Sequence, residues 1–142
     1  MTEIQIRGTY RFAVASYQPE GPQPRQTIWS VGTVVEIGEL VTLETIQGET
    51  GTVEPEHIIE PVKPVWIDKG ELLDACRDAR GFLDVWEVEK LGPGVHEVWP
   101  GEPGERHDGL TECVVSHGGD LIYFFLPEQY LQTKRTTQSR PR

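Results

Sequence analysis

Apolar residues alternate with polar or small residues through the first 62 positions, and this period of two is typical of half-buried strands. The alternation of Ile4 and Ile6, and then of Tyr10, Phe12 and Val14, predicts the first strand region, and further strands are predicted at residues 27–37, 40–46 and 50–53. Three prolines and a glycine within residues 18–26 predict an exposed loop between the first two strands. Residues 55–59 fit one short helical turn, and Pro61 and Pro64 favour an extended, stiff connection up to residue 67.

The period changes at Asp68, where a helix is predicted to begin. Asp68 can cap the free N–H groups, and Glu71 three residues later completes the pattern of a capping box. Apolar residues then recur at helical spacing, at Leu72, Leu73, Cys76 and Ala79. Gly81 is placed to end the helix.

Strands are predicted again in the remainder of the chain. Residues 83–90, which contain Trp86, and residues 95–99 have the composition of strands, and residues 100–109 that of a polar loop. Residues 128–131 fit one last helical turn.

A glycine pair, Gly118-Gly119, separates two apolar runs and predicts a hairpin. A two-residue closure pairs His117 with Asp120, Val115 with Ile122, and Cys113 with Phe124. Because residues 121–126 are apolar on both faces, we expect them to form a central strand.

The elements together predict a mainly β (α+β) protein: a small barrel at residues 1–62, then one helix and an antiparallel sheet at residues 63–132. Residues 133–142 contain no apolar side chain and are expected to be a disordered basic tail. The two regions hold roughly 60 and 70 residues, so each is marginal alone, and we expect extensive packing between them.

Residues 3–62 resemble an SH3-like small barrel at the level of the fold. The resemblance rests on Trp29-Ser-Val-Gly-Thr-Val-Val35, on the strand at 40–46, and on Gly51-Thr-Val-Glu-Pro-Glu-His-Ile-Ile59. It implies a strand, a long loop, short strands with tight turns, a single turn and a last strand. Small barrels serve nucleic-acid, peptide and structural roles alike, so the resemblance implies no particular function.

Charge separates the body of the chain from its end. The chain of 142 residues has 13 Lys+Arg against 23 Asp+Glu, a net charge of −10, and without its last nine residues the body carries −14. No Lys or Arg lies between Arg25 and Lys63, where seven glutamates stand, and six of them are candidate binding residues: Glu36, Glu39, Glu44, Glu49, Glu54 and Glu56. Such a field favours a basic protein partner and opposes duplex nucleic acid. The alternative is a solvated, solubilising surface.

The sequence gives no pattern of a membrane or secreted protein. No apolar run approaches the roughly 20 residues of a spanning helix, and Met1–Arg7 lacks the basic flank and apolar core of a signal peptide. We therefore expect a cytoplasmic protein without membrane association. Two cysteines are too few for a disulfide framework.

Metal-binding residue types concentrate near the C-terminal hairpin, at His96, His107, Cys113 and His117. Their spacing matches no zinc pattern, and no paired CxxC or HxxxH presets two ligands on one element. We expect Cys113 to be a small core residue and His117 to form a turn-end ion pair with Asp120. Nucleophile elbows and phosphate-binding loops are also missing from the sequence, so we predict no cofactor and no enzymatic activity.

Among the four tryptophans, Trp66 in the connection and Trp99 before the polar loop are the best candidates for partial exposure and partner contact. Three hypotheses follow. The first is a non-enzymatic acidic protein that binds a basic protein surface, such as an inhibitor or modulator of a nucleic-acid-binding enzyme. The second is a structural or assembly module, and the third is a small metal-dependent hydrolase that uses the His96–His117 segment.

Overall fold

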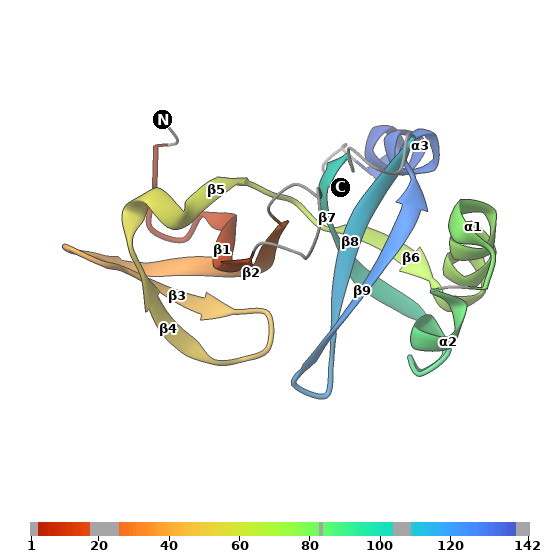
Figure 1. Cartoon of the computed structure of the whole chain (residues 1–142), viewed down its shortest axis with the longest axis horizontal. Helices are drawn as coiled ribbons and strands as arrows, with labels where there is room; N and C mark the ends of the chain where they lie inside the picture. Colours follow the sequence, from red (N-terminus) through yellow and green to blue (C-terminus); the bar gives the residue numbers. More distant parts are fainter. Residues whose placement is uncertain (1–2, 18–25, 83, 104–108, 139–142) are drawn as a thin grey trace. The chain divides into compact units, whose positions relative to one another are not determined.

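The computed structural model describes residues 3–17, 26–82, 84–103 and 109–138. The chain divides into two compact units, Met1–Val62 and Lys63–Arg142, which we call the N-terminal and C-terminal units. Each unit contains one antiparallel sheet, so the fold is mainly β with few helices (Figure 1). None of the helices in the described ranges is long and apolar enough to cross a bilayer.

The N-terminal unit is a five-stranded sheet with one 3₁₀ turn. Its elements are β1 (Thr9–Tyr17), β2 (Gln26–Ile37), β3 (Val41–Thr45), β4 (Thr50–Val53), η1 (Pro55–His57) and β5 (Ile58–Pro61). The strand order is β4-β3-β2-β1-β5, so β4 and β5 are the edges (Figure 1). The predicted loop at 18–26 lies outside the described residues except for Gln26, which begins β2.

Alternating apolar residues fill the inner face of this sheet, as the period of two predicts. Val34 lies opposite Leu43, and Val41 lies opposite Val53. The buried cluster consists of Tyr10, Phe12, Val34, Val41, Leu43 and Ile58. Gly32 is closely packed, because a Cβ there would lie 3.1 Å from the Leu43 Cβ and 3.3 Å from the Phe12 ring, so these neighbours would have to shift slightly.

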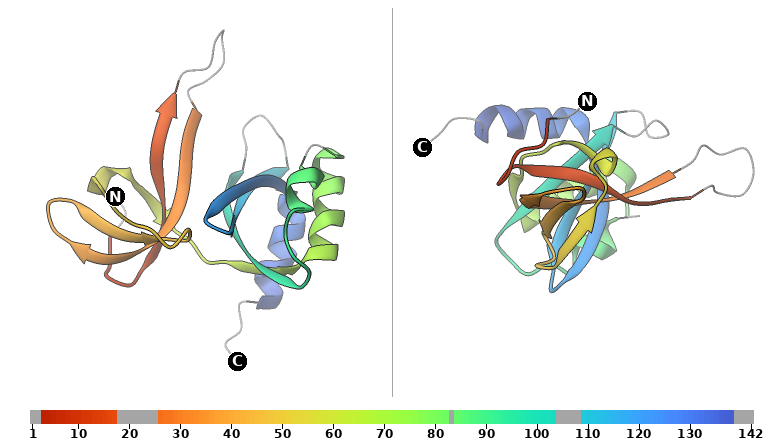
Figure 2. Two further views of the ribbon diagram at one scale, coloured as in Figure 1. Left: turned by 90° about the horizontal axis from the view of Figure 1, so that it is seen from below. Right: turned by 90° about the vertical axis from the view of Figure 1, so that its left-hand side faces the viewer.

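The C-terminal unit is a four-stranded sheet with three helices. Its elements are β6 (Val65–Asp68), α1 (Lys69–Arg80), α2 (Val85–Val88), β7 (Val95–Pro103), β8 (Leu110–His117), β9 (Asp120–Pro127) and α3 (Glu128–Gln138). The strand order is β6-β7-β8-β9. All three helices contribute to one buried cluster with the sheet, and Figure 2 shows α1 alongside it.

Two local predictions in this unit are confirmed. Asp68 caps α1, because its carboxylate accepts a hydrogen bond of 3.0 Å from the Gly70 N–H, and Gly81 ends the helix with a φ of 63°. The β8–β9 hairpin has the predicted register: His117 with Asp120, Val115 with Ile122, and Cys113 with Phe124. Short-range chemistry decides both features, which is why the sequence predicts them.

Other predictions for this unit are wrong. Residues 85–88 form a helix, and Val65–Asp68 is a strand paired with β7 rather than a connection. The apolar strand β9 is an edge strand and not a central one. One backbone group of this strand is paired outside the sheet, because the carboxylate of Asp84 accepts a hydrogen bond of 2.8 Å from the Phe125 N–H.

The expectation of a disordered tail from residue 133 is also wrong, because α3 continues to Gln138. Leu131 is fully buried, and Lys134 Nζ lies 2.7 Å from the Glu71 carboxylate on α1. Leu131 therefore anchors α3 in the buried cluster, and the ion pair places the following turn beside α1. Residues 139–142 lie outside the described chain.

Candidate protein-binding surface

Six glutamates form what we call the acidic surface of the N-terminal unit, and all six are exposed: Glu36, Glu39, Glu44, Glu49, Glu54 and Glu56. On the outer face of the sheet, Glu44 lies between Thr33 of β2 and Thr50 of β4, and Glu36 lies opposite Thr42. The strand pairings thus combine carboxylates with uncharged hydroxyl side chains. Glu39 and Glu49 lie in the turns that flank β3, and Glu54 and Glu56 lie at η1.

A groove of about 460 Å³ opens on the same unit, and we call it the β1–β4 groove. Its walls come from β1, β3, β4 and η1: Phe12, Ala13, Val14, Leu40, Leu43, Thr45, Gly51, Thr52, Val53, Glu54 and His57. Val14 is 58% exposed and Leu40 is 45% exposed, so apolar side chains in the groove face solvent. Its volume is in the range of sites that hold small ligands or single side chains.

The carboxyl groups of Glu54 and Glu56 interact with each other at the end of the groove. A hydrogen bond from Glu54 to the Glu56 carboxylate raises the pKa of Glu54, and the negative charge of Glu56 raises it further. The same hydrogen bond lowers the pKa of Glu56. As the pH falls, Glu54 therefore takes up a proton before Glu56, and the pair loses its charge in two steps.

The exposure of the tryptophans agrees with prediction at one position and not at the other. Trp66 is 49% exposed on β6, as expected, whereas Trp99 is only 8% exposed. The expectation for Trp99 is wrong because β7 continues to Pro103, so Trp99 lies inside a strand opposite Val114 of β8 rather than before a loop.

The most exposed large apolar side chains of the described chain are Trp86, at 74%, and Phe82, at 66%. Neither residue is among the positions for which the sequence predicts partner contact. The signal for Trp86 is the spacing of Val85, Val88 and Leu91, which are all buried. Steps of three residues indicate a helical stripe, and Trp86 lies outside that stripe.

The proposed metal ligands do not come together. His96 Nε2 lies 2.6 Å from the Gly92 carbonyl oxygen, and His117 is exposed at the turn opposite Asp120. Cys113 is completely buried, and burial raises the pKa of its thiol well above the usual range. His107 lies outside the described residues, and within them no three His, Cys, Asp or Glu side chains are placed to hold a metal ion.

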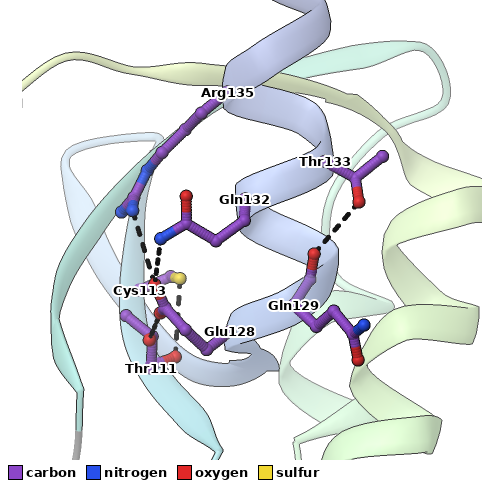
Figure 3. A network of polar contacts seen from close by, with 7 residues as sticks. All are labelled: Thr111, Cys113, Glu128, Gln129, Gln132, Thr133 and Arg135. Carbon is purple, nitrogen blue, oxygen red and sulfur yellow. Dashed lines mark hydrogen bonds and ion pairs between the residues drawn. The ribbon is translucent and has the colours of Figure 1, made fainter.

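A polar network joins β8 to α3 in the C-terminal unit (Figure 3). The buried Thr111 hydroxyl and the Gln132 amide both donate hydrogen bonds to the Glu128 carboxylate, and Arg135 Nη1 lies 3.5 Å from it. The Glu128 N–H itself donates to the Gly109 carbonyl oxygen at 2.7 Å. These contacts attach the first turn of α3 to the sheet, and the carboxylate is occupied by groups of the chain itself.

Comparison with known proteins adds no relative: no protein-family model, curated protein or solved structure matches this chain. Any assignment of function therefore rests on the surface and the groove of the N-terminal unit.

Proposed function

We propose that the protein is a non-enzymatic acidic interaction protein whose N-terminal unit binds a basic surface on a protein partner. The partner class is a cationic protein such as a nucleic-acid-binding enzyme, which this protein would inhibit or modulate, by analogy with small acidic proteins of bacteriophages and toxin–immunity pairs. The proposal includes a cytoplasmic location, which fits two free, buried cysteines. It includes no cofactor, no duplex DNA binding and no membrane association.

The exposure of all six glutamates is the observation that supports this function. Residues 1–62 carry nine glutamates against three arginines. Arg11 does not contribute a free surface charge, because its guanidinium is buried, lies 2.8 Å from Glu60 and stacks over Trp29 at 5.1 Å. The field of such a surface attracts cations, speeds association and repels phosphate.

The proposal also keeps the SH3-like small barrel as the fold of this unit. The strand order β4-β3-β2-β1-β5, with η1 between β4 and β5, supports it. A fold of this kind is a scaffold and does not determine a function, so binding depends on the exposed side chains.

A structural or assembly role is the second candidate, and the position of β4 at the edge of the sheet in the described residues favours it, because strand edges invite pairing with another chain. Sedimentation of the purified protein distinguishes the two candidates. Reversible self-association without a partner would favour assembly, whereas a monomer that captures a basic protein would favour the acidic interaction protein.

The decisive experiment is stopped-flow association with a basic protein captured from the native host. Raising the salt from about 0.05 to 0.5 M shortens the Debye length from about 14 to about 4 Å. We expect association to slow at least tenfold while dissociation changes less. In a parallel gel shift at physiological salt, duplex DNA should remain unbound.

Two triple variants with the same change in net charge locate the binding surface. Glu36→Lys, Glu44→Lys and Glu49→Lys together alter the acidic surface, and the matched control alters three exposed acids of the C-terminal unit: Asp78→Lys, Glu89→Lys and Asp120→Lys. Only the first triple should reproduce the effect of high salt. A salt-independent association rate, or tight DNA binding, would contradict the proposal, and equal effects of both triples would contradict the assignment to the N-terminal unit.

A further inference from the structure

We infer that the β1–β4 groove binds an extended segment of the partner, in which an apolar side chain enters the groove and neighbouring Lys or Arg side chains reach the acidic surface. This inference rests on the proposed function and specifies the form of the ligand. Binding by the acidic surface alone needs only charge, whereas the groove would also select an apolar side chain in the partner.

The first support is the lining of the groove. Phe12, Leu43 and Val53 form its floor next to the core, and Val14 and Leu40 remain about half exposed at its mouth. A partner side chain that covered these groups would remove apolar area from water on both sides of the contact. An isolated exposed apolar residue needs no explanation, but here several surround one hollow.

The second support is that β4 lies along the groove at the edge of the sheet that the described residues form. Gly51, Thr52 and Val53 line the groove and belong to a strand at the end of the sheet order. The Thr45 N–H donates to the Glu49 carbonyl oxygen at 2.7 Å, so these two residues form a hydrogen-bonded pair. Hydrogen-bonded and non-hydrogen-bonded pairs alternate along the β3–β4 ladder, which makes Thr50 and Thr52 members of non-hydrogen-bonded pairs. The peptide groups of Thr50 and Thr52 therefore point away from β3, where an added strand can pair with them.

The third support is the charge at the groove. Glu54 lines the groove and follows the last residue of β4. Glu49 precedes the first residue of β4, and Glu44 of β3 lies opposite Thr50. Lys and Arg are missing from the groove lining in the described part of the chain. Since successive side chains of an added strand point to opposite faces, one residue can enter the groove while its neighbours reach carboxylates.

Two peptides test the inference on the full chain. The first is a heptapeptide with a central leucine between lysines, and the second has glycine at the centre with the same charge. Titration followed by amide chemical shifts should give at least tenfold weaker binding for the glycine peptide, because the buried leucine is lost. The leucine peptide should shift the amides of Val14, Leu40, Gly51 and His57.

Two substitutions to leucine on neighbouring strands provide matched variants. A Cβ at Gly51 would meet no atom within 4 Å, and Gly51 lies opposite the inward-facing Leu43, so Gly51→Leu directs a side chain into the groove. Thr42→Leu adds the same kind of side chain to the outer face of β3, away from the groove lining and from the edge of β4. We expect Gly51→Leu to weaken the leucine peptide at least tenfold and Thr42→Leu to change it less than twofold, with melting curves as the check on folding.

The variant Val14→Glu distinguishes binding in the groove from long-range electrostatic attraction. This substitution makes the unit more acidic, so attraction alone would tighten binding of a cationic peptide, whereas obstruction of the groove would weaken it. Weaker binding supports the inference, and tighter binding overturns it.

The remaining outcomes are equally decisive. Equal affinity for the two peptides, or unchanged binding by Gly51→Leu, would overturn the groove while salt-dependent capture of a basic protein could still stand. Loss of that capture as well would refute the proposed function. Concentration-dependent dimerisation abolished by Gly51→Leu would show that a second copy, and not a basic segment, occupies the groove.

Discussion

Asp84 joins α1 to β9 in the C-terminal unit through its carboxylate, so Asp84→Ala should be strongly destabilising. Its carboxylate accepts hydrogen bonds of 3.0 and 2.5 Å from Arg80 at the end of α1, and one of 2.8 Å from the Phe125 N–H on the edge of β9. The Arg80 guanidinium also lies 4.2 Å from the centre of the Phe125 ring. Alanine would leave the Arg80 charge and a strand N–H without this partner.

The burial of the pair sets the size of the effect. The Asp84 side chain is 6% exposed and that of Arg80 is 22% exposed. Removing one partner of a buried ion pair costs about 3–5 kcal/mol, and partial access of water to Arg80 places the expected loss near the lower end, at about 3 kcal/mol. For a unit of this size, at about 4–8 °C per kcal/mol, such a loss lowers the melting temperature by about 12–24 °C.

Scanning calorimetry of three variants tests this reasoning. Asp74→Ala is the matched control, because Asp74 also pairs with an arginine one turn away, Arg77, but is 75% exposed. An exposed pair contributes little, so this variant should stay within about 0.5 kcal/mol of the parent. Asp84→Asn should be intermediate, since the amide oxygen can still accept the Phe125 N–H. A loss below about 1 kcal/mol for Asp84→Ala, or equal losses at Asp74 and Asp84, would refute the structural role of this carboxylate.

Three further predictions concern buried groups. Cys76 and Cys113 should not react with a thiol reagent at pH 8 unless the protein is unfolded, because burial raises the pKa of Cys76 to about 12 and that of Cys113 well above its usual range; rapid native reaction would contradict their burial. Burial also raises the pKa of Tyr123 to about 12 from 10.0, so the unfolded state releases its proton first and stability should fall as the pH rises from 10 to 12; an absorbance titration against Tyr123→Phe checks this. Leu131→Ala should cost about 2–5 kcal/mol in denaturant unfolding because Leu131 is fully buried, whereas the exposed Gln129→Ala should change little.

The features that the sequence predicts correctly depend on residues close together in the chain. The Gly118-Gly119 turn sets the register of the β8–β9 hairpin, and Asp68 and Gly81 determine where α1 begins and ends. The position of β9 at the sheet edge could not be predicted, because its two apolar faces resemble those of a central strand. The N–H and the ring of Phe125 on this strand contact Asp84 and Arg80, which are about 40 residues away in the sequence.

The candidate site shows the same division between local and distant information. The period of two places Val41 and Leu43 on the inner face of β3 and Glu44 on the outer face, as the structure has them. The sequence does not predict the β1–β4 groove. Val14 of β1 and Gly51 of β4 both line it, although β1 and β4 are not adjacent in the sheet. The exposure of Val14 accompanies a shift in the register of β1 against β2 between Ala13 and Ala15, which a strict period of two does not predict.

Glu36 shows how a local irregularity decides the chemistry of a surface. A strict period of two would place Glu36 on the inner face with Val34, where an unpaired carboxylate would cost several kcal/mol. The register of β2 against β3 shifts between Val34 and Glu36, so one extra residue is inserted and Glu36 lies opposite Thr42 on the outer face. The bulge keeps Val34 fully buried while Glu36 joins Glu44 on the outer face. The charge of the acidic surface therefore depends on backbone geometry as well as on composition, and a count of glutamates along the sequence could not assign their faces.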